Sequence, residues 1–313
     1  MPASCVPIIN RRSVLLGSLI SAALGTRLAS ASVPGLPSAG KRLIVLEHRY
    51  VEHALSLGIA PVGVADLGYY LAHVGVGAAA LAHSRTASVG LRQEPNLEEI
   101  GRLAPDLIVG VRFRHSPIRE RLSAIAPTTL FDYTDVPADG PDQFVVMLDE
   151  LRSMGSAVDR TAEAEAAIAA FQTQLDSLRQ RVADAGLSNA PFVFAQFPSG
   201  SPFVRLFTDR SVAVELLRRI GLVNAWPGNY ERFGFNTVGP EKLVSLRDAL
   251  FIHAVIGSDS AYEKLTSGPV WRVMPFVKAG HVYRLPNDIW PFGGLTSAAR
   301  FVELVVDHLT HRK

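Results

Sequence analysis

The feature that most constrains the fold is the stretch of residues 143–186, which contains no proline and only one internal glycine, Gly155. It is rich in Ala, Glu, Gln, Leu and Arg at helical spacing, so it predicts one long helix or two in sequence. On both sides of it, short apolar runs alternate with helical patterns, which predicts mostly parallel sheets covered by helices. We therefore interpret the stretch as a rigid strut that joins two α/β lobes. The alternative is a surface helix of one domain.

A faint internal echo supports two similar lobes. Residues 88–109 are echoed by residues 241–252, and in each copy a short helix runs into an apolar strand. Each helix has leucines on one face, and a helix leading into a strand is half of a βαβ unit. Two lobes that face each other across a cleft more often hold a small molecule than form a one-piece catalyst, although a fold alone does not define a function.

The N-terminus has the pattern of an export signal. Arg11 and Arg12 precede the apolar run 14–24, and residues 29–31 form a cleavage site of small residues. The adjacent arginines favour the twin-arginine route over the general secretory route. We expect residues 1–31 to be removed after about Ala31, and the mature protein to work in the periplasm.

Composition divides the rest of the chain into a linker and three parts. We expect a Gly/Pro/Ser linker over residues 32–40, an N-terminal α/β lobe over 41–141, an interdomain helix region over 142–187 and a C-terminal α/β lobe over 188–313. The last pattern is an amphipathic helix over residues 297–308, which we expect to pack back onto the rest of the chain.

Composition also excludes several classes of function. The single cysteine, Cys5, lies in the leader, so we expect no disulfide, thiolate metal site or cysteine nucleophile in the mature chain. The leader holds three of the 31 basic residues and no acidic one, which leaves 28 basic against 29 acidic residues. This balance makes nucleic acid and anionic membranes poor partners, and we expect a soluble monomer.

Several enzyme signatures are missing from the sequence. They include the Gly-x-Ser-x-Gly nucleophile elbow, the Gly-x-x-x-x-Gly-Lys phosphate loop and the His-Glu-x-x-His zinc helix. Gly75 and Gly77 match part of a dinucleotide fingerprint, but they follow the second or a later predicted strand rather than the first. We therefore reject a dinucleotide site there.

Glu47, His48, Glu52 and His53 form the densest set of side chains that could bind a metal. Their spacing around a helix start does not make them converge on one point. We expect Glu47 to cap the helix, where the helix dipole favours a negative charge, and we expect no metal held by protein side chains.

Arg92 is the strongest candidate for a ligand contact. It lies just past a short predicted strand, at the end where open α/β sheets bind their ligands. A guanidinium stays charged at any working pH and can bind an anionic oxygen with two donors. The alternative role is a local salt bridge to Glu94.

Several longer motifs resemble a known family. They are Ile-Val-Leu-Glu at 44–47, Leu-Gly-Ile-Ala-Pro-Val-Gly-Val-Ala-Asp at 57–66, Gly-Leu-Arg-x-Glu-Pro-Asn-Leu-Glu at 90–98, Asn-Ala-Trp at 224–226, Trp-x-x-Met-Pro-Phe-Val-x-Ala-Gly at 271–280 and Gly-x-x-x-Ser-Ala-x-x-Phe-Val at 293–302. In order, and over nearly all of the mature chain, they resemble the periplasmic binding proteins of iron-siderophore ABC importers. The resemblance is strongest to the ferrichrome and hydroxamate branch.

The resemblance implies a bilobal periplasmic-binding-protein fold, with two α/β lobes joined by a long interdomain helix. Its cleft would hold a ferric siderophore for delivery to an inner-membrane ABC permease with its ATPase, without enzyme activity or a resident cofactor. The family's hydroxamate-contacting arginine falls on Arg92. Its cleft aromatics fall on Trp226, Phe233, Trp290 and Phe292.

The resemblance also implies two docking acids, one in each lobe, that contact permease arginines. The matching positions are Glu120 and Glu241. Both lie at predicted helix starts, so complementing the helix dipole is the alternative role for each.

The chain departs from the hydroxamate pattern in the first lobe. Relatives of that branch carry cleft aromatics at positions that align with His73, Gly110 and Arg114, with Arg112 alongside. A basic cluster formed with Arg92 attracts an anionic chelate. We therefore hypothesise a citrate-hydroxamate ferric siderophore rather than ferrichrome.

Two other functions stay open at this point. The same fold could bind haem or a corrinoid, and His73 is then the candidate axial ligand. A secreted α/β hydrolase or oxidoreductase would instead need a nucleophile, a base and an orienting group within hydrogen-bond distance.

Overall fold

The computed structural model of the chain describes residues 40–133, 140–257 and 260–310. The predicted export signal, with its arginine pair and Cys5, lies outside the described residues, as does all of the predicted linker except Gly40. Within the described ranges, no helix combines the length and the hydropathy that crossing a bilayer requires. Residues 39–313 form one compact unit.

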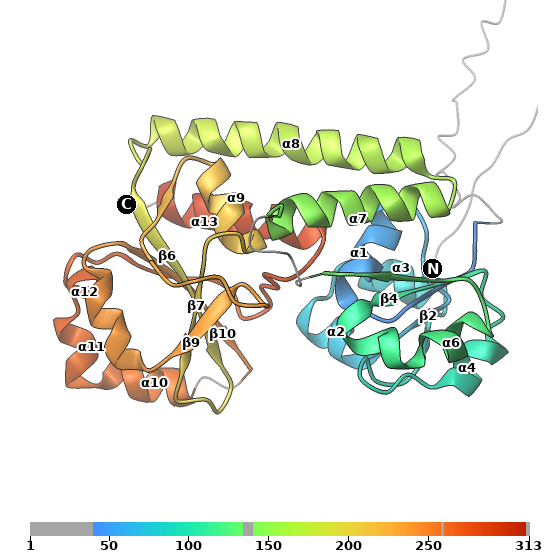
Figure 1. Cartoon of the computed structure of the whole chain (residues 1–313). Helices are drawn as coiled ribbons and strands as arrows, with labels where there is room; N and C mark the ends of the chain where they lie inside the picture. Colours follow the sequence, from blue (N-terminus) through green and yellow to red (C-terminus); the bar gives the residue numbers. More distant parts are fainter. Residues whose placement is uncertain (1–39, 134–139, 258–259, 311–313) are drawn as a thin grey trace, which may run out of the picture. The chain divides into compact units, whose positions relative to one another are not determined.

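The first sheet of this unit is fully parallel, as the alternation of strands and helices predicts. Two of its strands, β2 and β4, are labelled in Figure 1. Its strand order is β3-β2-β1-β4-β5, with β1 at Leu43–Val45, β2 at Gly63–Val64, β3 at Ala87–Ser88, β4 at Leu107–Val111 and β5 at Thr128–Phe131. The connections contain α1 (His48–Ser56), α2 (Leu67–His73), α3 (Ala78–His83), α4 (Leu97–Arg102), α5 (Arg112–His115), η1 (Ser116–Ile118) and α6 (Arg119–Ser123). In a parallel sheet all carboxyl ends lie at one edge, so the residues that follow these strands gather there.

The second sheet is mixed. Its order is β11-β10-β6-β7-β9, with β6 at Pro191–Pro198, β7 at Val204–Phe207, β9 at Phe235–Val238, β10 at Leu250–Ile256 and β11 at Val282–Arg284; β8 (Val223–Asn224) also pairs with β6. The pairs of β6 with β8 and β10, and of β10 with β11, are parallel, whereas β7 is antiparallel to both β6 and β9. The sheets are therefore mostly parallel, as expected, and β7 is the exception because it runs antiparallel to both of its neighbours. A connection as short as the one from β6 to β7 can only form an antiparallel hairpin.

Two helices, not one, occupy the proline-free stretch. They are α7 (Gln143–Ala157) and α8 (Thr161–Asp184), which pack against each other. The break lies at Asp159, whose φ of 59° is left-handed and cannot continue an α-helix. Gly155 lets the two helices approach closely, because a Cβ at this position would lie 2.9 Å from the Cβ of Ala164. Of the two alternatives that the sequence leaves open, one long helix or two in sequence, the structure has the second.

The remaining helices belong to the C-terminal half. They are α9 (Val212–Arg219), η2 (Pro240–Leu246), α10 (Ser260–Ser267), α11 (Pro269–Val273), α12 (Pro275–Lys278) and α13 (Leu295–Thr310). The echo is visible as α4 leading into β4 and as η2 leading into β10, although η2 is a 3₁₀ helix. Helix α13 packs against α1, α8 and α9. One buried apolar cluster therefore contains residues of both sheets and of the helices between them.

Candidate ligand-binding site

A pocket with about 650 Å³ of free space, including the solvent at its mouth, collects side chains from both halves of the compact unit. Its lining residues are Glu47, Arg92, Arg114 and Tyr133 from the first half, and Arg205, Phe233, Phe235, Trp290 and Phe292 from the second. A lining that combines several rings with charged groups suits a small organic ligand rather than a bare ion. The pocket is partly aromatic and partly charged.

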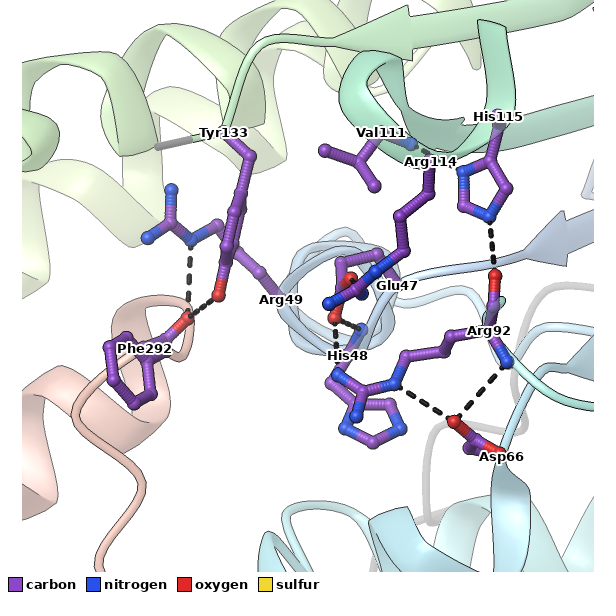
Figure 2. A network of polar contacts seen from close by, with 10 residues as sticks. All are labelled: Glu47, His48, Arg49, Asp66, Arg92, Val111, Arg114, His115, Tyr133 and Phe292. Carbon is purple, nitrogen blue, oxygen red and sulfur yellow. Dashed lines mark hydrogen bonds and ion pairs between the residues drawn. The ribbon is translucent and has the colours of Figure 1, made fainter. Parts of the chain in front are cut away.

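Glu47 is the centre of the polar side of the pocket (Figure 2). It follows β1 directly and caps α1, where its Oε1 accepts a hydrogen bond from the His48 backbone nitrogen at 3.0 Å. The predicted capping role is therefore confirmed. The same carboxylate also forms ion pairs with the guanidinium groups of Arg92, at 2.9 Å, and of Arg114.

The two arginines determine the charge of Glu47. Burial alone would raise the pKa of this carboxyl group, since only 2% of the side chain is exposed, but Arg92 and Arg114 overcome that effect and hold its pKa below the ordinary value. Glu47 is thus ionised at neutral pH. Together with Asp66, which pairs with Arg92, it balances the charges of Arg92 and Arg114.

Four contacts fix Arg92 in the pocket wall. Its Nη1 binds Glu47, and its Nε binds Asp66 Oδ2 at 3.0 Å. Its backbone nitrogen also donates to Asp66, while its carbonyl oxygen lies 2.9 Å from Nε2 of His115. The alternative of a salt bridge to Glu94 is wrong, because the acidic partners come from the loops after β1 and β2.

The other two predicted arginines, Arg112 and Arg114, lie in different places. Arg114 lines the pocket and lies over the ring of Phe113, with 4.7 Å from its Cζ to the ring centroid. Arg112 is half-exposed, pairs with Asp132 at 2.7 Å and is not among the lining residues. The two side chains leave the short helix α5 in different directions, which spacing alone could not resolve.

Aromatic rings form the opposite side of the pocket. Phe233, Trp290 and Phe292 line it, as the resemblance implies, and Phe235 joins them. Phe233 stacks on Phe235 and meets Phe113 edge-on, with centroid distances of 6.2 and 5.9 Å. These rings offer apolar area to a ligand with little loss of side-chain entropy.

Besides Arg112, two more of the predicted contact residues lie outside the lining set. Trp226 packs on the separate apolar cluster beneath the second sheet, and its Nε1 donates to Asn236 Oδ1 at 2.8 Å. His73 contacts Tyr69 with the two rings tilted, at a centroid distance of 4.2 Å, at the end of α2. Both rings were predicted to line the pocket. In the structure, neighbouring side chains hold each ring outside it.

Arg205 is the main residue that the sequence analysis missed. It lies on β7, donates to Gln196 Oε1 at 3.0 Å and covers the ring of Phe235 at 4.7 Å. Among the described residues, no carboxylate lies within ion-pair distance of its guanidinium. Burial lowers the pKa of Arg205, as expected for a cation with little water and no anion beside it.

The base of the pocket is held by buried polar contacts. The Tyr133 hydroxyl and Arg49 Nε both donate to the carbonyl oxygen of Phe292, at 3.0 and 3.4 Å (Figure 2). Glu150 accepts from Arg49 Nη1 and from the Tyr133 backbone nitrogen. The loop that carries Phe292 is therefore attached to α1, although the two are far apart in sequence.

Glu47 is one of four side chains that the sequence analysis considered as possible metal ligands. The other three are also buried, but they have different surroundings. Glu52 binds Ser297, and the rings of His48 and His53 have no hydrogen-bond partner among the described residues. Burial lowers the pKa of His48 to about 4 and that of His53 to about 3, so both are neutral at neutral pH. No group of three or more His, Cys, Asp or Glu side chains in the described part of the chain could hold a metal ion.

The two predicted docking acids are exposed. Glu120 lies in the first turn of α6 and Glu241 in the first turn of η2, so both positions are helix starts as expected. The carboxylate of Glu241 folds back over Gly239, where a side chain would collide with it. Neither acid has an ion-pair partner among the described residues.

Comparison with known proteins shows similarity over most of the chain. The chain is 29% identical to the iron(3+)-hydroxamate-binding protein FhuD of Escherichia coli K12, over 96% of this chain and 97% of that protein. It is also 29% identical to the Fe(3+)-citrate-binding protein YfmC of Bacillus subtilis, over 85% and 79%. Among solved structures, the siderophore-binding protein FhuD of Vibrio cholerae with bound ferric Desferal has a TM-score of 0.71 at 25% identity, over 87% of this chain and 99% of that one.

The family profile of the periplasmic binding proteins matches residues 43–289, from the first strand of the first sheet to the loop before Trp290. That range contains most of the pocket lining and both sheets. A fold of two α/β halves with a pocket lined from both, and a matching profile over most of the chain, lead to one assignment: this chain belongs to the periplasmic binding protein family.

Proposed function

We propose that this protein captures a ferric siderophore in the pocket between Glu47 and Phe292 and delivers it to an ABC importer. The observation that carries the proposal is the composition of the pocket, which guanidinium groups and aromatic rings line together. Iron that is already wrapped in an organic chelator needs no protein ligand. The chelator instead presents oxygen atoms and apolar carbon, and these two sides of the pocket match both.

The polar side would bind the oxygens of the chelate. Arg92 and Arg114 are held by Glu47, so their remaining donors are oriented before a ligand arrives. Preorganised donors lose little entropy on binding. The ring of Tyr133 and the rings of Phe233, Trp290 and Phe292 would cover the apolar part of the ligand.

Arg205 carries the proposal of an anionic ligand. Glu47 and Asp66 balance Arg92 and Arg114, whereas Arg205 has no acidic partner among the described residues. A ligand carboxylate beside Arg205 would supply the missing counter-charge to a partly buried cation. This favours a chelate with a citrate-type carboxylate, such as a citrate-hydroxamate, over neutral ferrichrome. Known relatives include both hydroxamate-binding and citrate-binding proteins.

The same proposal covers the role and location of the chain. We infer that the protein binds and releases its ligand unchanged as an exported monomer, with residues 1–31 as the twin-arginine signal. The transported ferric chelate would be its only ligand, and an inner-membrane permease with its ATPase its partner. His73 gives the haem alternative no support, since its ring lies tilted against Tyr69 and is not among the lining residues.

Tryptophan fluorescence titration of the mature chain tests the proposal. Ferric dicitrate and a ferric citrate-hydroxamate should quench the emission with dissociation constants of about 1 μM or below, and cationic ferric desferrioxamine B should bind more weakly. Failure of all ferric chelates to bind at millimolar concentration would refute the function.

The variant Arg205→Gln tests the ligand class separately. It should weaken ferric dicitrate binding about tenfold or more while changing desferrioxamine binding little. Arg179→Gln is the matched control, because it removes the same charge from an exposed position on α8. Equal losses for both chelates in Arg205→Gln would exclude the anionic ligand but leave siderophore binding intact.

A further inference from the structure

His115 occupies a position that the binding proposal does not use. It ends the short helix α5, its side chain is completely buried, and both of its ring nitrogens are engaged (Figure 2). Nδ1 accepts a hydrogen bond from the Val111 backbone nitrogen at 2.9 Å, and Nε2 lies 2.9 Å from the carbonyl oxygen of Arg92.

The two partners define the state of the ring. A backbone N–H can only donate and a carbonyl oxygen can only accept, so Nδ1 must be bare and Nε2 must carry the proton. The ring is therefore a neutral imidazole in one tautomer. Protonation at Nδ1 would place two donors against each other, at Val111 and the ring.

The turn that holds Arg92 has few other attachments on this side. Leu91 and Glu94 bond to each other across the turn, and Asn96 bonds back to Val89. His115 is the contact that ties the carbonyl of Arg92 to the end of β4 and α5. Since α5 also carries Arg114, the ring joins the two loops whose guanidinium groups share Glu47.

Gly110 makes room for this arrangement. A Cβ at Gly110 would lie 2.7 Å from Nδ1 of His115 and 3.1 Å from a methyl group of Leu130. Any larger residue in this part of β4 would displace the ring from Val111. The glycine and the histidine therefore form one structural unit.

We propose that His115 is a positioning residue for ligand binding: its neutral ring fastens the Arg92 turn to α5 and so sets the distance between the guanidinium groups of Arg92 and Arg114. This inference rests on the proposed function, because Arg92 and Arg114 are the ligand contacts that it aligns. The charged groups that face the ring are Glu47, from the start of α1, and Arg114 of its own helix.

Two substitutions separate the two hydrogen bonds. The carbonyl of Asn lies where Nδ1 does, so His115→Asn keeps the acceptor for Val111 and loses the donor to Arg92. The amide nitrogen of Gln reaches about as far as Nε2, so His115→Gln keeps the donor to Arg92 and loses the acceptor for Val111. A merely structural histidine would give equal effects in both variants.

Hydrogen exchange tests the fastening without any ligand. In His115→Asn, the amides of residues 91–96 should exchange at least tenfold faster than in the wild type, while the Val111 amide stays protected. In His115→Gln the pattern should reverse. Unchanged exchange at 91–96 in His115→Asn would overturn the proposal, whatever the protein binds.

Titration with ferric dicitrate and ferric desferrioxamine B then tests the consequence for binding. In His115→Asn, the affinity for whichever chelate the wild type binds should fall about tenfold. In His115→Gln, most of the wild-type affinity should remain. If the wild type binds neither chelate, the proposed function fails while the exchange result still decides the role of His115. Equal affinity in all three proteins would overturn the positioning role.

The pH profile gives a further readout. Burial, together with Arg114, lowers the pKa of His115, so wild-type affinity should hold through neutral pH and fall once the pH passes below that lowered pKa. His115→Gln has no titrating ring at this position, so its affinity should not show this fall at low pH. Should either variant fail to fold, ¹⁵N NMR of the wild-type histidines decides instead: a cationic ring or an Nδ1–H tautomer at pH 7 would contradict the proposal.

Discussion

The carboxylate of Glu52 accepts two hydrogen bonds from Ser297, at 2.8 Å from the backbone nitrogen and 2.7 Å from the hydroxyl group. Glu52 lies on α1 and Ser297 in the first turn of α13, so an acid in the first half of the chain caps the last helix. A negative charge at this helix N-terminus is favourable. The carboxylate is nevertheless completely buried, and burial raises its pKa despite the bonds from Ser297.

The variants Glu52→Gln and Ser297→Ala should have opposite effects on the free energy of unfolding. The glutamine oxygen can accept from the Ser297 backbone nitrogen while its NH2 group donates to the Ser297 hydroxyl oxygen, and no buried charge remains, so Glu52→Gln should be neutral or slightly stabilising at pH 7. Ser297→Ala removes a partner from the buried carboxylate and should cost about 1 to 3 kcal/mol. Urea unfolding of both variants measures the difference.

The pH dependence supplies an internal check on Glu52. Its pKa in the folded state is raised above 4.5, so the folded form holds its proton more tightly than the unfolded form does. Stability from this group is present below pH 4.5 and is lost as the pH rises to the folded pKa. Glu52→Gln should lack this loss, and a wild-type slope in the variant would contradict the assignment.

Glu47→Gln should lower stability and change ligand preference together. The substitution leaves Arg92 and Arg114, both largely buried, without their shared anion, which should cost about 2 kcal/mol or more. The more positive pocket should bind ferric dicitrate more tightly relative to ferric desferrioxamine B. Glu98→Gln, at an exposed helix start, is the control for loss of one carboxylate.

Glu47 also predicts part of the response to acid. Because Arg92 and Arg114 hold its folded pKa below 4.5, its contribution to stability is present above pH 4.5 and is lost as the pH falls through the folded value. Unfolding measured at pH 7 and at pH 4 should therefore show a smaller acid loss in Glu47→Gln than in the wild type. An equal loss would mean that other groups dominate the acid response.

Phe233→Ala should weaken ligand binding with little effect on stability. Phe233 lines the pocket but is 37% exposed. Its removal should therefore reduce the area that contacts the ligand without opening a large cavity in the core. We expect about a tenfold loss in affinity by fluorescence titration. Phe203→Ala is the matched control, because Phe203 is 50% exposed and is not among the lining residues. A similar loss in both variants would argue against the aromatic wall.

Charge reversal at Glu120 or Glu241 should spare binding and impair uptake. Both acids are exposed and lie outside the pocket lining, so Glu120→Lys and Glu241→Lys should titrate like the wild type. Uptake of radioactive iron by cells that carry the cognate importer should fall several-fold if these acids dock on permease arginines. Glu263→Lys reverses a comparable first-turn acid on α10. Normal uptake with both Glu120→Lys and Glu241→Lys would show that these acids do not dock on the permease.

Open α/β sheets bind their ligands at the carboxyl ends of their strands, and this rule explains what could be predicted about the site. It identified Arg92 from the sequence, and it applies equally to Glu47 after β1 and to Tyr133 after β5, which both line the pocket. It could not distinguish Arg112 from Arg114, because the direction of each side chain depends on the four-residue helix α5. A rule based on strand ends locates a site better than it orients the side chains there.

The residues that were missed lie on the antiparallel strands. Arg205 interrupts an otherwise apolar strand, β7, and Phe235 begins β9. A charged residue in a short apolar strand was the signal available in the sequence. Its meaning depended on the hairpin from β6 to β7, which the expectation of parallel strands did not include.

The buried cluster that includes Leu43 of β1 also includes Phe192 of β6 and Val305 of α13. Neither sheet can expose the apolar side chains that it contributes to this cluster without opening the common interior. Heat or denaturant should therefore melt the two halves in a single cooperative transition. A chelate that binds only at the pocket would then raise the melting temperature of strands that it never touches.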